Sequence, residues 1–149
     1  MCLSASSKVQ KKKTVTQPNK QNIRDSEIFS VASGTGFMVT DKGHIITNNH
    51  VINGCDNVKT YQKGQDYPVT IIATDSVNDL ALLKTTLKTK DVLSLSNKNA
   101  FLMQDVFVAG YPFGKSVSSS VKVTKGIVSA LSGLRNNYSN MQIDAALQP

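Results

Sequence analysis

One of the two histidines of this chain, His50, lies in the segment ITNNHVINGC, directly after an apolar run with the pattern of a strand. A carboxylate, Asp79, begins another apolar run, DLALLK. A carboxylate at such a boundary is costly unless it is exposed or paired, and an imidazole is a natural partner for it. If the two side chains meet, Asp79 accepts the Nδ1 proton and leaves Nε2 of His50 free to act as a general base near neutral pH.

Residue type alone leaves the role of His50 open between a structural group, a metal ligand and a proton carrier. A metal site is not favoured, because nothing in the pattern makes the second histidine, His44, face His50 and Asp79. His44 follows a turn at the start of a strand, where we expect it at the surface. Gly114-Lys115-Ser116 matches the end of a phosphate-binding loop, but the glycine that the pattern requires five positions before Gly114 is Ala109, so such a loop is not indicated. The sequence therefore predicts no metal and no cofactor.

Other side chains with nucleophilic chemistry have simpler interpretations. Four serines lie in a stretch without the Gly-x-Ser-x-Gly pattern of a nucleophile elbow, and we interpret them as strand or loop surface. They are Ser116, Ser118, Ser119 and Ser120. Cys55 is interpreted as a small, inert thiol. Asp144 is interpreted as a structural residue or one near a substrate cleft.

The elements that must position His50 and Asp79 are short β-type runs. Gly34–Thr40 and His44–Asn48 flank the turn Asp41–Gly43 and predict a hairpin. Further strands are expected at 57–62, 67–75, 79–84, 105–112 and 116–132, with a last one at 141–145. Because short strands recur every 8–12 residues or so and no long amphipathic helix is evident, the sequence predicts an all-β barrel or sandwich.

The charge of the chain is uneven. Its net charge is +7, and residues 1–28 carry six basic side chains against two acidic ones. This segment is polar and poor in large apolar groups, so we expect a flexible, Lys-rich tail. The cluster Lys11–Lys13 could touch nucleic acid or anionic lipid, but no aromatic residues interleave with it, and a solvated linker is the favoured interpretation.

Several blocks of the sequence together resemble one family. The blocks are SGTGFMVTDKGHIITNNHVING, ATDSVNDLALLK, VFVAGYPFG, VTKGIVSAL and MQIDAALQP, in that order over about residues 31–149. They resemble the trypsin-like serine proteases of the HtrA (Deg) type. The resemblance implies an all-β, trypsin-like double β-barrel, with a first barrel at 29–98 and an incomplete second barrel at 99–149. It also implies that His50 is the general base and Asp79 the catalytic aspartate.

In that family a segment similar to DAALQP is followed at once by Gly-Asn-Ser-Gly-Gly, which carries the nucleophile. Here Pro149 is the last residue, so the nucleophilic serine and its oxyanion donors are expected just after Pro149. We therefore expect a serine endopeptidase domain that is inactive over these 149 residues alone. An incomplete second barrel also predicts an unpaired strand edge near Ser116–Ser132.

Partners and compartment follow from the same resemblance. It implies polypeptide substrates, unfolded proteins among them, a homo-oligomeric parent protein, and a periplasmic or secreted location. No apolar run reaches the roughly 18 residues of a membrane span, and the N-terminus has no apolar stretch of signal-peptide length. Two other classes stay open: a non-catalytic β-barrel module that binds peptides, and a binder of nucleic acid or membrane surfaces that works through the basic tail. Nucleic acid is not the expected partner.

Overall fold

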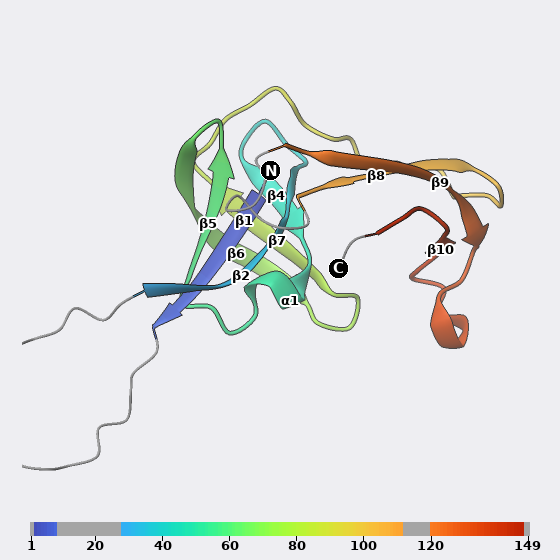
Figure 1. Cartoon of the computed structure of the whole chain (residues 1–149), viewed down its shortest axis with the longest axis horizontal. Helices are drawn as coiled ribbons and strands as arrows, with labels where there is room; N and C mark the ends of the chain where they lie inside the picture. Colours follow the sequence, from blue (N-terminus) through green and yellow to red (C-terminus); the bar gives the residue numbers. More distant parts are fainter. Residues whose placement is uncertain (1, 9–27, 112–119, 148–149) are drawn as a thin grey trace, which may run out of the picture.

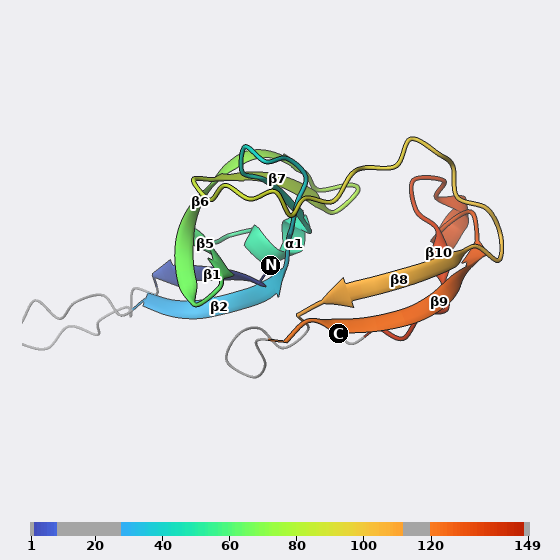
Figure 2. The ribbon, with the colours of Figure 1, turned by 90° about the horizontal axis from the view of Figure 1, so that it is seen from above.

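The computed structural model describes residues 2–8, 28–111 and 120–147. Its first unit is one seven-stranded sheet with the order β2-β1-β5-β6-β7-β4-β3. The strands are β1 (Cys2–Lys8), β2 (Ile28–Thr35), β3 (Phe37–Met38), β4 (His44–Thr47), β5 (Asn57–Gln62), β6 (Gln65–Asp75) and β7 (Leu80–Thr85). Because only Gly36 separates β2 from β3, the two ends of the sheet are joined through the chain. The sheet therefore curls round on itself (Figures 1 and 2).

The predicted all-β class is confirmed, and so is the hairpin across Asp41–Gly43. Strands β3 and β4 pair antiparallel across the turn Asp41–Gly43, where Gly43 has a φ of +94°. Strands β5 and β6 are joined by Lys63 and Gly64, both of which have positive φ. Two residues of that kind match the twist of the flanking strands, so β6 begins at Gln65, two residues earlier than expected.

The expectation of a flexible tail over residues 1–28 is wrong for residues 2–8. These residues form β1, which pairs antiparallel with β2 on one side and with β5 on the other. The reason is non-local: backbone groups of two distant strands supply the hydrogen bonds that a polar side-chain composition does not reveal. The first unit thus draws a strand from the segment assigned to the tail. The cluster Lys11–Lys13 lies outside the described residues.

A small core holds the first unit together. It consists of Met38, Ile45, Val51, Ile52, Val58, Ala81 and Leu83. Ile45 of β4 and Leu83 of β7 are both fully buried and stand opposite each other in the strand register. Alternate residues of β7 are buried, as expected for a strand with one face on a core. This core fixes β4 and β7, the two strands next to His50 and Asp79 in the sequence.

The second unit is a three-stranded antiparallel sheet with the order β10-β9-β8. Its strands are β8 (Asp105–Gly110), β9 (Lys122–Ala130) and β10 (Gln142–Ile143), and the short 3₁₀ helix η1 (Leu134–Asn136) lies between the last two. Strand β8 pairs with residues 122–127 of β9, and β10 pairs with Val128 and Ala130, so the part of the open edge expected near Ser116–Ser132 that falls on β9 is covered by a strand on one side only. Among the described residues, β8 and β10 form the edges.

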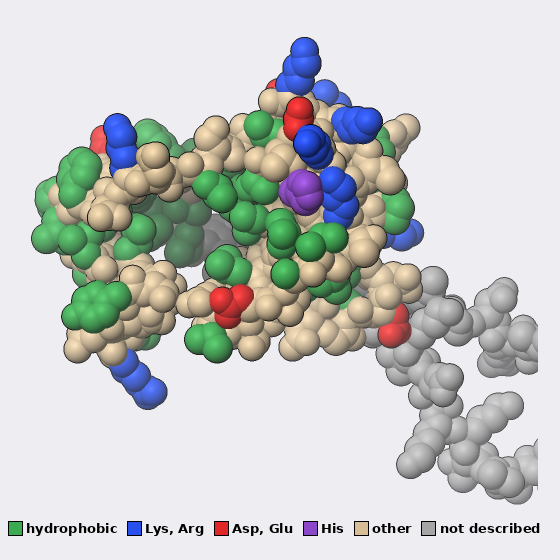
Figure 3. All heavy atoms as spheres, turned by 180° about the vertical axis from the view of Figure 1, so that it is seen from behind, with side chains coloured by type: hydrophobic (Ala, Val, Ile, Leu, Met, Phe, Trp, Pro, Cys, Tyr) green, Lys and Arg blue, Asp and Glu red, His purple; other side chains and the backbone are tan. Residues whose placement is uncertain are grey.

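Most large apolar side chains of the second unit are exposed. Within the described part of this unit, the buried hydrophobic residues are Val128 and Ala145. The exposed ones include Phe101, Leu102, Met103, Phe107, Val123, Leu134, Tyr138 and Met141. Figure 3 shows hydrophobic side chains gathered over this part of the molecule, on the left. The sheet is thus an open layer with little core of its own. None of the helices among the described residues is long and apolar enough to cross a membrane.

Replacement of Gly43 by alanine should destabilise the chain much more than replacement of Gly64. Both glycines have positive φ, but a Cβ on Gly43 would overlap the carbonyl oxygen of Thr85 and lie 3.0 Å from that of Leu87, whereas a Cβ on Gly64 meets nothing. We expect Gly64→Ala to cost about 1 kcal/mol from backbone strain and Gly43→Ala about 3 kcal/mol or more. Urea unfolding followed by circular dichroism measures both. Equal losses for the two variants would contradict this packing.

Candidate active site

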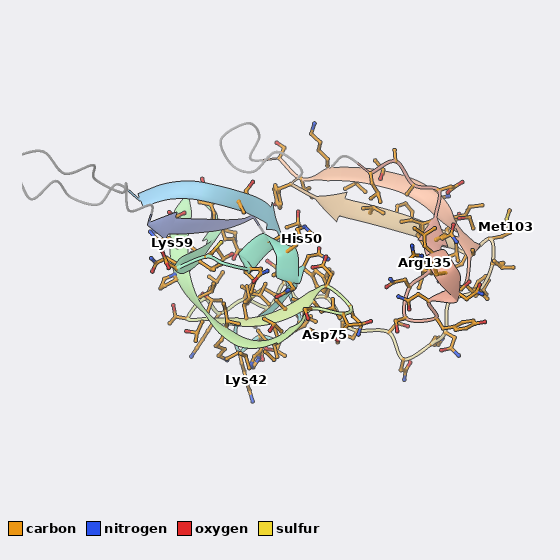
Figure 4. The ribbon with its side chains drawn as sticks, turned by 90° about the horizontal axis from the view of Figure 1, so that it is seen from below. Lys42, His50, Lys59, Asp75, Met103 and Arg135 are labelled. Atoms are coloured by element: carbon orange, nitrogen blue, oxygen red, sulfur yellow. The ribbon has the colours of Figure 1, made fainter. Side chains whose placement is uncertain are left out.

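His50 lies on α1 (Asn49–Ile52), a single helical turn that begins just after β4 ends. One turn of helix is not stable by itself, so its position depends on packing. Val51 and Ile52 are buried in the core of the first unit, whereas the His50 side chain is 71% exposed. Neighbouring helix residues point in different directions, so anchoring Val51 and Ile52 turns the His50 ring outward. Figure 4 shows His50 on the side of the first unit that faces the three-stranded sheet.

Asp79 is presented by the turn between β6 and β7. Asp75 fixes this turn: its Oδ1 accepts the backbone N–H groups of Val77 (2.9 Å) and Asn78 (3.0 Å), and its Oδ2 accepts Nδ2 of Asn78 (2.6 Å). These bonds, those of Asn78 first, hold the pKa of Asp75 below its ordinary value. Asp79 follows with a φ of +54°, a left-handed conformation that costs a non-glycine residue about 1–3 kcal/mol. Strain of this size persists only where surrounding bonds over-determine the backbone.

The structure brings His50 and Asp79 together. Asp79 Oδ2 lies 2.6 Å from His50 Nδ1, and Asp79 Oδ1 accepts the backbone N–H of His50 at 2.8 Å. Both carboxylate oxygens are therefore bound by one residue. The pKa of Asp79 is lowered, first by the backbone N–H of His50 and then by its ring. A carboxylate that stays ionised accepts a hydrogen bond from the protonated Nδ1, which leaves Nε2 of the neutral ring as a proton acceptor.

Asn48 is a site residue that our sequence reasoning missed. Its Nδ2 lies 3.2 Å from both the backbone oxygen and Oδ2 of Asp79. The next residue, Asn49, donates its backbone N–H to the backbone oxygen of Asp79 at 3.1 Å. Asparagine before a helix is usually explained as an N-cap, so the letters alone gave no reason to connect Asn48 with Asp79.

A cleft of about 570 Å³ opens between the two units beside His50. One wall is formed by Ser33–Thr35 with Asn48, His50 and Val51, and the other by residues of β8, β9 and the segment 146–147. Thr35 joins the walls, because its Oγ1 accepts the backbone N–H of Tyr111 at 2.8 Å. A Cβ on Gly110 would lie 2.9 Å from the same Oγ1, so glycine permits this close approach. The cleft has the size of a binding site for a small molecule or a few residues of peptide.

Comparison with known proteins now identifies the family. Residues 34–149, well over half of the chain, match the model of the trypsin-like peptidase domain. The chain belongs to this family. The expected resemblance to trypsin-like proteases of the HtrA type is thereby confirmed.

The curated relatives of this trypsin-like peptidase domain are longer proteins. An uncharacterized protein, y4bJ, of Sinorhizobium fredii is 40% identical over 119 residues, which are 79% of this chain and 19% of that protein. A "Probable periplasmic serine endoprotease DegP-like" of Chlamydia pneumoniae is 35% identical over 78% of this chain and 24% of its own length. A "Serine protease Do-like HtrA" of Lactobacillus helveticus is 34% identical over 83% and 32%. The chain thus spans about a fifth to a third of these relatives.

The remaining candidates lie apart from the His50–Asp79 pair of this trypsin-like domain. His44 begins β4, at the end of the strand opposite to α1, and its Nδ1 lies 2.7 Å from Thr40 Oγ1. In the described segments no three histidine, cysteine or acidic side chains gather as metal ligands would. Burial, with a smaller effect of Asp56, raises the pKa of the half-buried Cys55 thiol, which therefore stays protonated and is a poor nucleophile.

Asp144 has a place outside the pair as well. Asp144 Oδ1 accepts the backbone N–H of Ile127 at 2.6 Å, and its own N–H donates to the Ile127 oxygen at 3.2 Å. Its role is therefore to hold the segment after β10 against β9. Ser120 is exposed. Ser116, Ser118 and Ser119 lie outside the described residues.

The carboxyl group of Asp79 should titrate below the ordinary aspartate pKa of about 3.9. Because its folded pKa is lowered, its hydrogen bonds stabilise the fold above that ordinary value, and this stabilisation is lost as the pH falls through the lowered pKa. In His50→Ala the ring donor disappears but the backbone N–H stays, so the midpoint should rise only part of the way. NMR titration of the carboxyl carbon measures both midpoints. An ordinary midpoint in the unaltered chain, or no rise in the variant, would contradict the observed contacts.

Proposed function

We propose that this chain carries the histidine and aspartate of a serine endopeptidase, with His50 as general base and Asp79 as the carboxylate that orients it. The observation that carries this proposal is the 2.6 Å contact between His50 Nδ1 and Asp79 Oδ2 at the edge of a cleft. The pair leaves Nε2 of an exposed ring available as a proton acceptor. Membership of the trypsin-like peptidase family supports the same assignment.

The mechanism follows from that arrangement. Nε2 of His50 takes the hydroxyl proton of a serine while the serine oxygen bonds to the carbonyl carbon of a peptide. The imidazolium, stabilised by the ionised Asp79, then gives this proton to the leaving amine as the peptide bond breaks. Water hydrolyses the resulting acyl-enzyme with His50 again as the base. Asp79 keeps its charge throughout, in agreement with its lowered pKa.

The proposal assigns the nucleophilic serine to residues that follow Pro149 in a longer protein. Support comes from the length of the relatives, of which this chain spans 19–32%. We infer that residues 1–149 alone do not hydrolyse peptides, because His50 and Asp79 activate a hydroxyl and do not replace it. The same reasoning assigns the oxyanion donors to the following residues.

The substrates and the compartment are part of the same proposal. We propose polypeptide substrates, unfolded proteins among them, a homo-oligomeric protein, and a periplasmic or secreted location. Several of the relatives are named "Probable periplasmic serine endoprotease DegP-like", which supports the substrate class and the compartment. A role in nucleic-acid or membrane-surface binding would depend on the cluster Lys11–Lys13, which lies outside the described residues.

The proposed longer protein, which carries residues after Pro149, is called the gene-encoded protein below. Replacement of its His50 by alanine should reduce cleavage of unfolded casein by about 10⁴- to 10⁶-fold. The loss should appear in kcat more than in KM, because the ring acts on the proton and not on substrate binding. His44→Ala is the matched control and should keep its activity, since His44 contacts Thr40 and lies outside the cleft. The assay measures cleavage as the release of fluorescent casein fragments. This cleavage should be sensitive to serine-directed inhibitors.

Retention of activity in His50→Ala would contradict the proposed role. So would inhibitor-sensitive cleavage by the purified 149-residue chain, which we expect to be inactive. Peptide binding without any turnover by the gene-encoded protein would favour a non-catalytic peptide-binding module in its place.

A further inference from the structure

We propose that Asn48 is a positioning residue that holds Asp79 in the conformation needed to bind the His50 ring. This inference rests on the proposed function, because it concerns the same His50–Asp79 pair. It adds a third side chain to the pair and assigns it a task distinct from helix capping. Three observations on the described residues carry it.

The first observation is where the Asn48 side chain goes. Asn48 occupies the N-cap position of α1, and asparagine there commonly accepts a hydrogen bond from a backbone N–H of the first turn. Asn48 makes no such side-chain bond. Its amide instead donates across 31 positions of sequence to Asp79. The side chain is thus committed to Asp79 at the expense of the helix that it precedes.

The second observation is that one amide group contacts both the backbone and the side chain of Asp79. Asn48 Nδ2 lies 3.2 Å from the Asp79 carbonyl oxygen and 3.2 Å from Oδ2. A donor between these two atoms restricts both the peptide plane and the rotation of the carboxylate. Oδ2 is also the atom that receives the Nδ1 proton of His50 at 2.6 Å. Asn48 therefore acts on the oxygen that orients the ring.

The third observation is the strained backbone of Asp79. Its φ of +54° needs outside support, and the described bonds to Asp79 come from three consecutive residues, Asn48, Asn49 and His50. Two of these supports are backbone N–H groups that survive any substitution except proline. Apart from the His50 ring itself, the support from Asn48 is the one that depends on a side chain. It is therefore the adjustable part of the arrangement.

Two effects of Asn48 on His50 have opposite signs, which makes the inference testable. If Asn48 mainly positions Asp79, its removal lets the carboxylate move away, and the hydrogen bond from His50 Nδ1 to Asp79 Oδ2 weakens. If Asn48 mainly competes for Oδ2, its removal leaves a stronger acceptor, and that hydrogen bond strengthens. Our inference requires the weakening.

The test is NMR of the His50 ring in the 149-residue chain, which needs no catalytic turnover. In Asn48→Ala we expect the low-field resonance of the Nδ1 proton to weaken or disappear, because Oδ2 no longer stays in place to accept it. The nitrogen-15 shifts of the ring should change from one tautomer to a mixture of both. Asn49→Ala is the matched control, because it changes the next residue and keeps the backbone N–H that bonds to Asp79. It should leave both signals unchanged.

Asn48→Ser separates positioning of Asp79 from stability of the helix. Serine is as good an N-cap as asparagine, but its hydroxyl is too short to reach Asp79. We expect the Nδ1 proton resonance of His50 to be lost as in Asn48→Ala, while the thermal unfolding midpoint stays close to that of the unaltered chain. Recovery of that resonance in Asn48→Ser would overturn the inference in favour of capping. A stronger or unchanged resonance in Asn48→Ala, or an equal loss in Asn49→Ala, would overturn it too.

These outcomes are independent of the proposed function. If His50→Ala retains activity in the gene-encoded protein, the catalytic proposal fails, whatever the ring resonances show. If the Nδ1 proton resonance persists in Asn48→Ala while His50→Ala is inactive, the role of Asn48 fails and the catalytic proposal stands.

Discussion

The hydrogen bond between His50 Nδ1 and Asp79 Oδ2 is the interaction on which the proposed chemistry depends, and it is not held by its own strength. Both side chains are well exposed, at 71% and 42%, and ion pairs at such positions contribute little in water. The geometry comes from the backbone instead. The carboxylate of Asp79 accepts the backbone N–H of His50, and the hydrogen bonds of Asp75 fix the turn that leads to Asp79. The His50 ring and the Asp79 carboxylate therefore meet because their main chains are fixed.

One core fixes both main chains. Val51 and Ile52 tie α1 to the first unit, and Ala81 and Leu83 tie β7 to it, so His50 and Asp79 extend from two sides of the same packed cluster. Strand β4 leads into α1 and pairs with β7, which sets the spacing between them. The curled sheet, in which β1 pairs with both β2 and β5, thereby supports the two exposed side chains of His50 and Asp79.

Local patterns predicted the local structure. Alternating apolar residues and turn glycines located β3 to β7 and the turn at Gly43. Charge and position made a contact between His50 and Asp79 plausible, and the resemblance to trypsin-like proteases is what predicted it. What the sequence did not reveal is non-local. Strand β1 forms because two distant strands offer it partners, and Asn48 turns to Asp79 although its position suggests a helix cap. The open edges of the second unit depend on pairing order, which alternation does not encode.

The tautomer of neutral His50 is the most direct test of the account. Which ring nitrogen carries the proton is set by the hydrogen bond that the ring makes, and the observed contact requires the proton on Nδ1. Nitrogen-15 NMR of the imidazole, at a pH at which the ring is neutral, distinguishes the tautomer with the proton on Nδ1 from the one with the proton on Nε2. The account predicts that Nδ1 carries the proton and that Nε2 has the shift of an unprotonated nitrogen. A ring protonated on Nε2 would contradict it, because no base would then face the cleft.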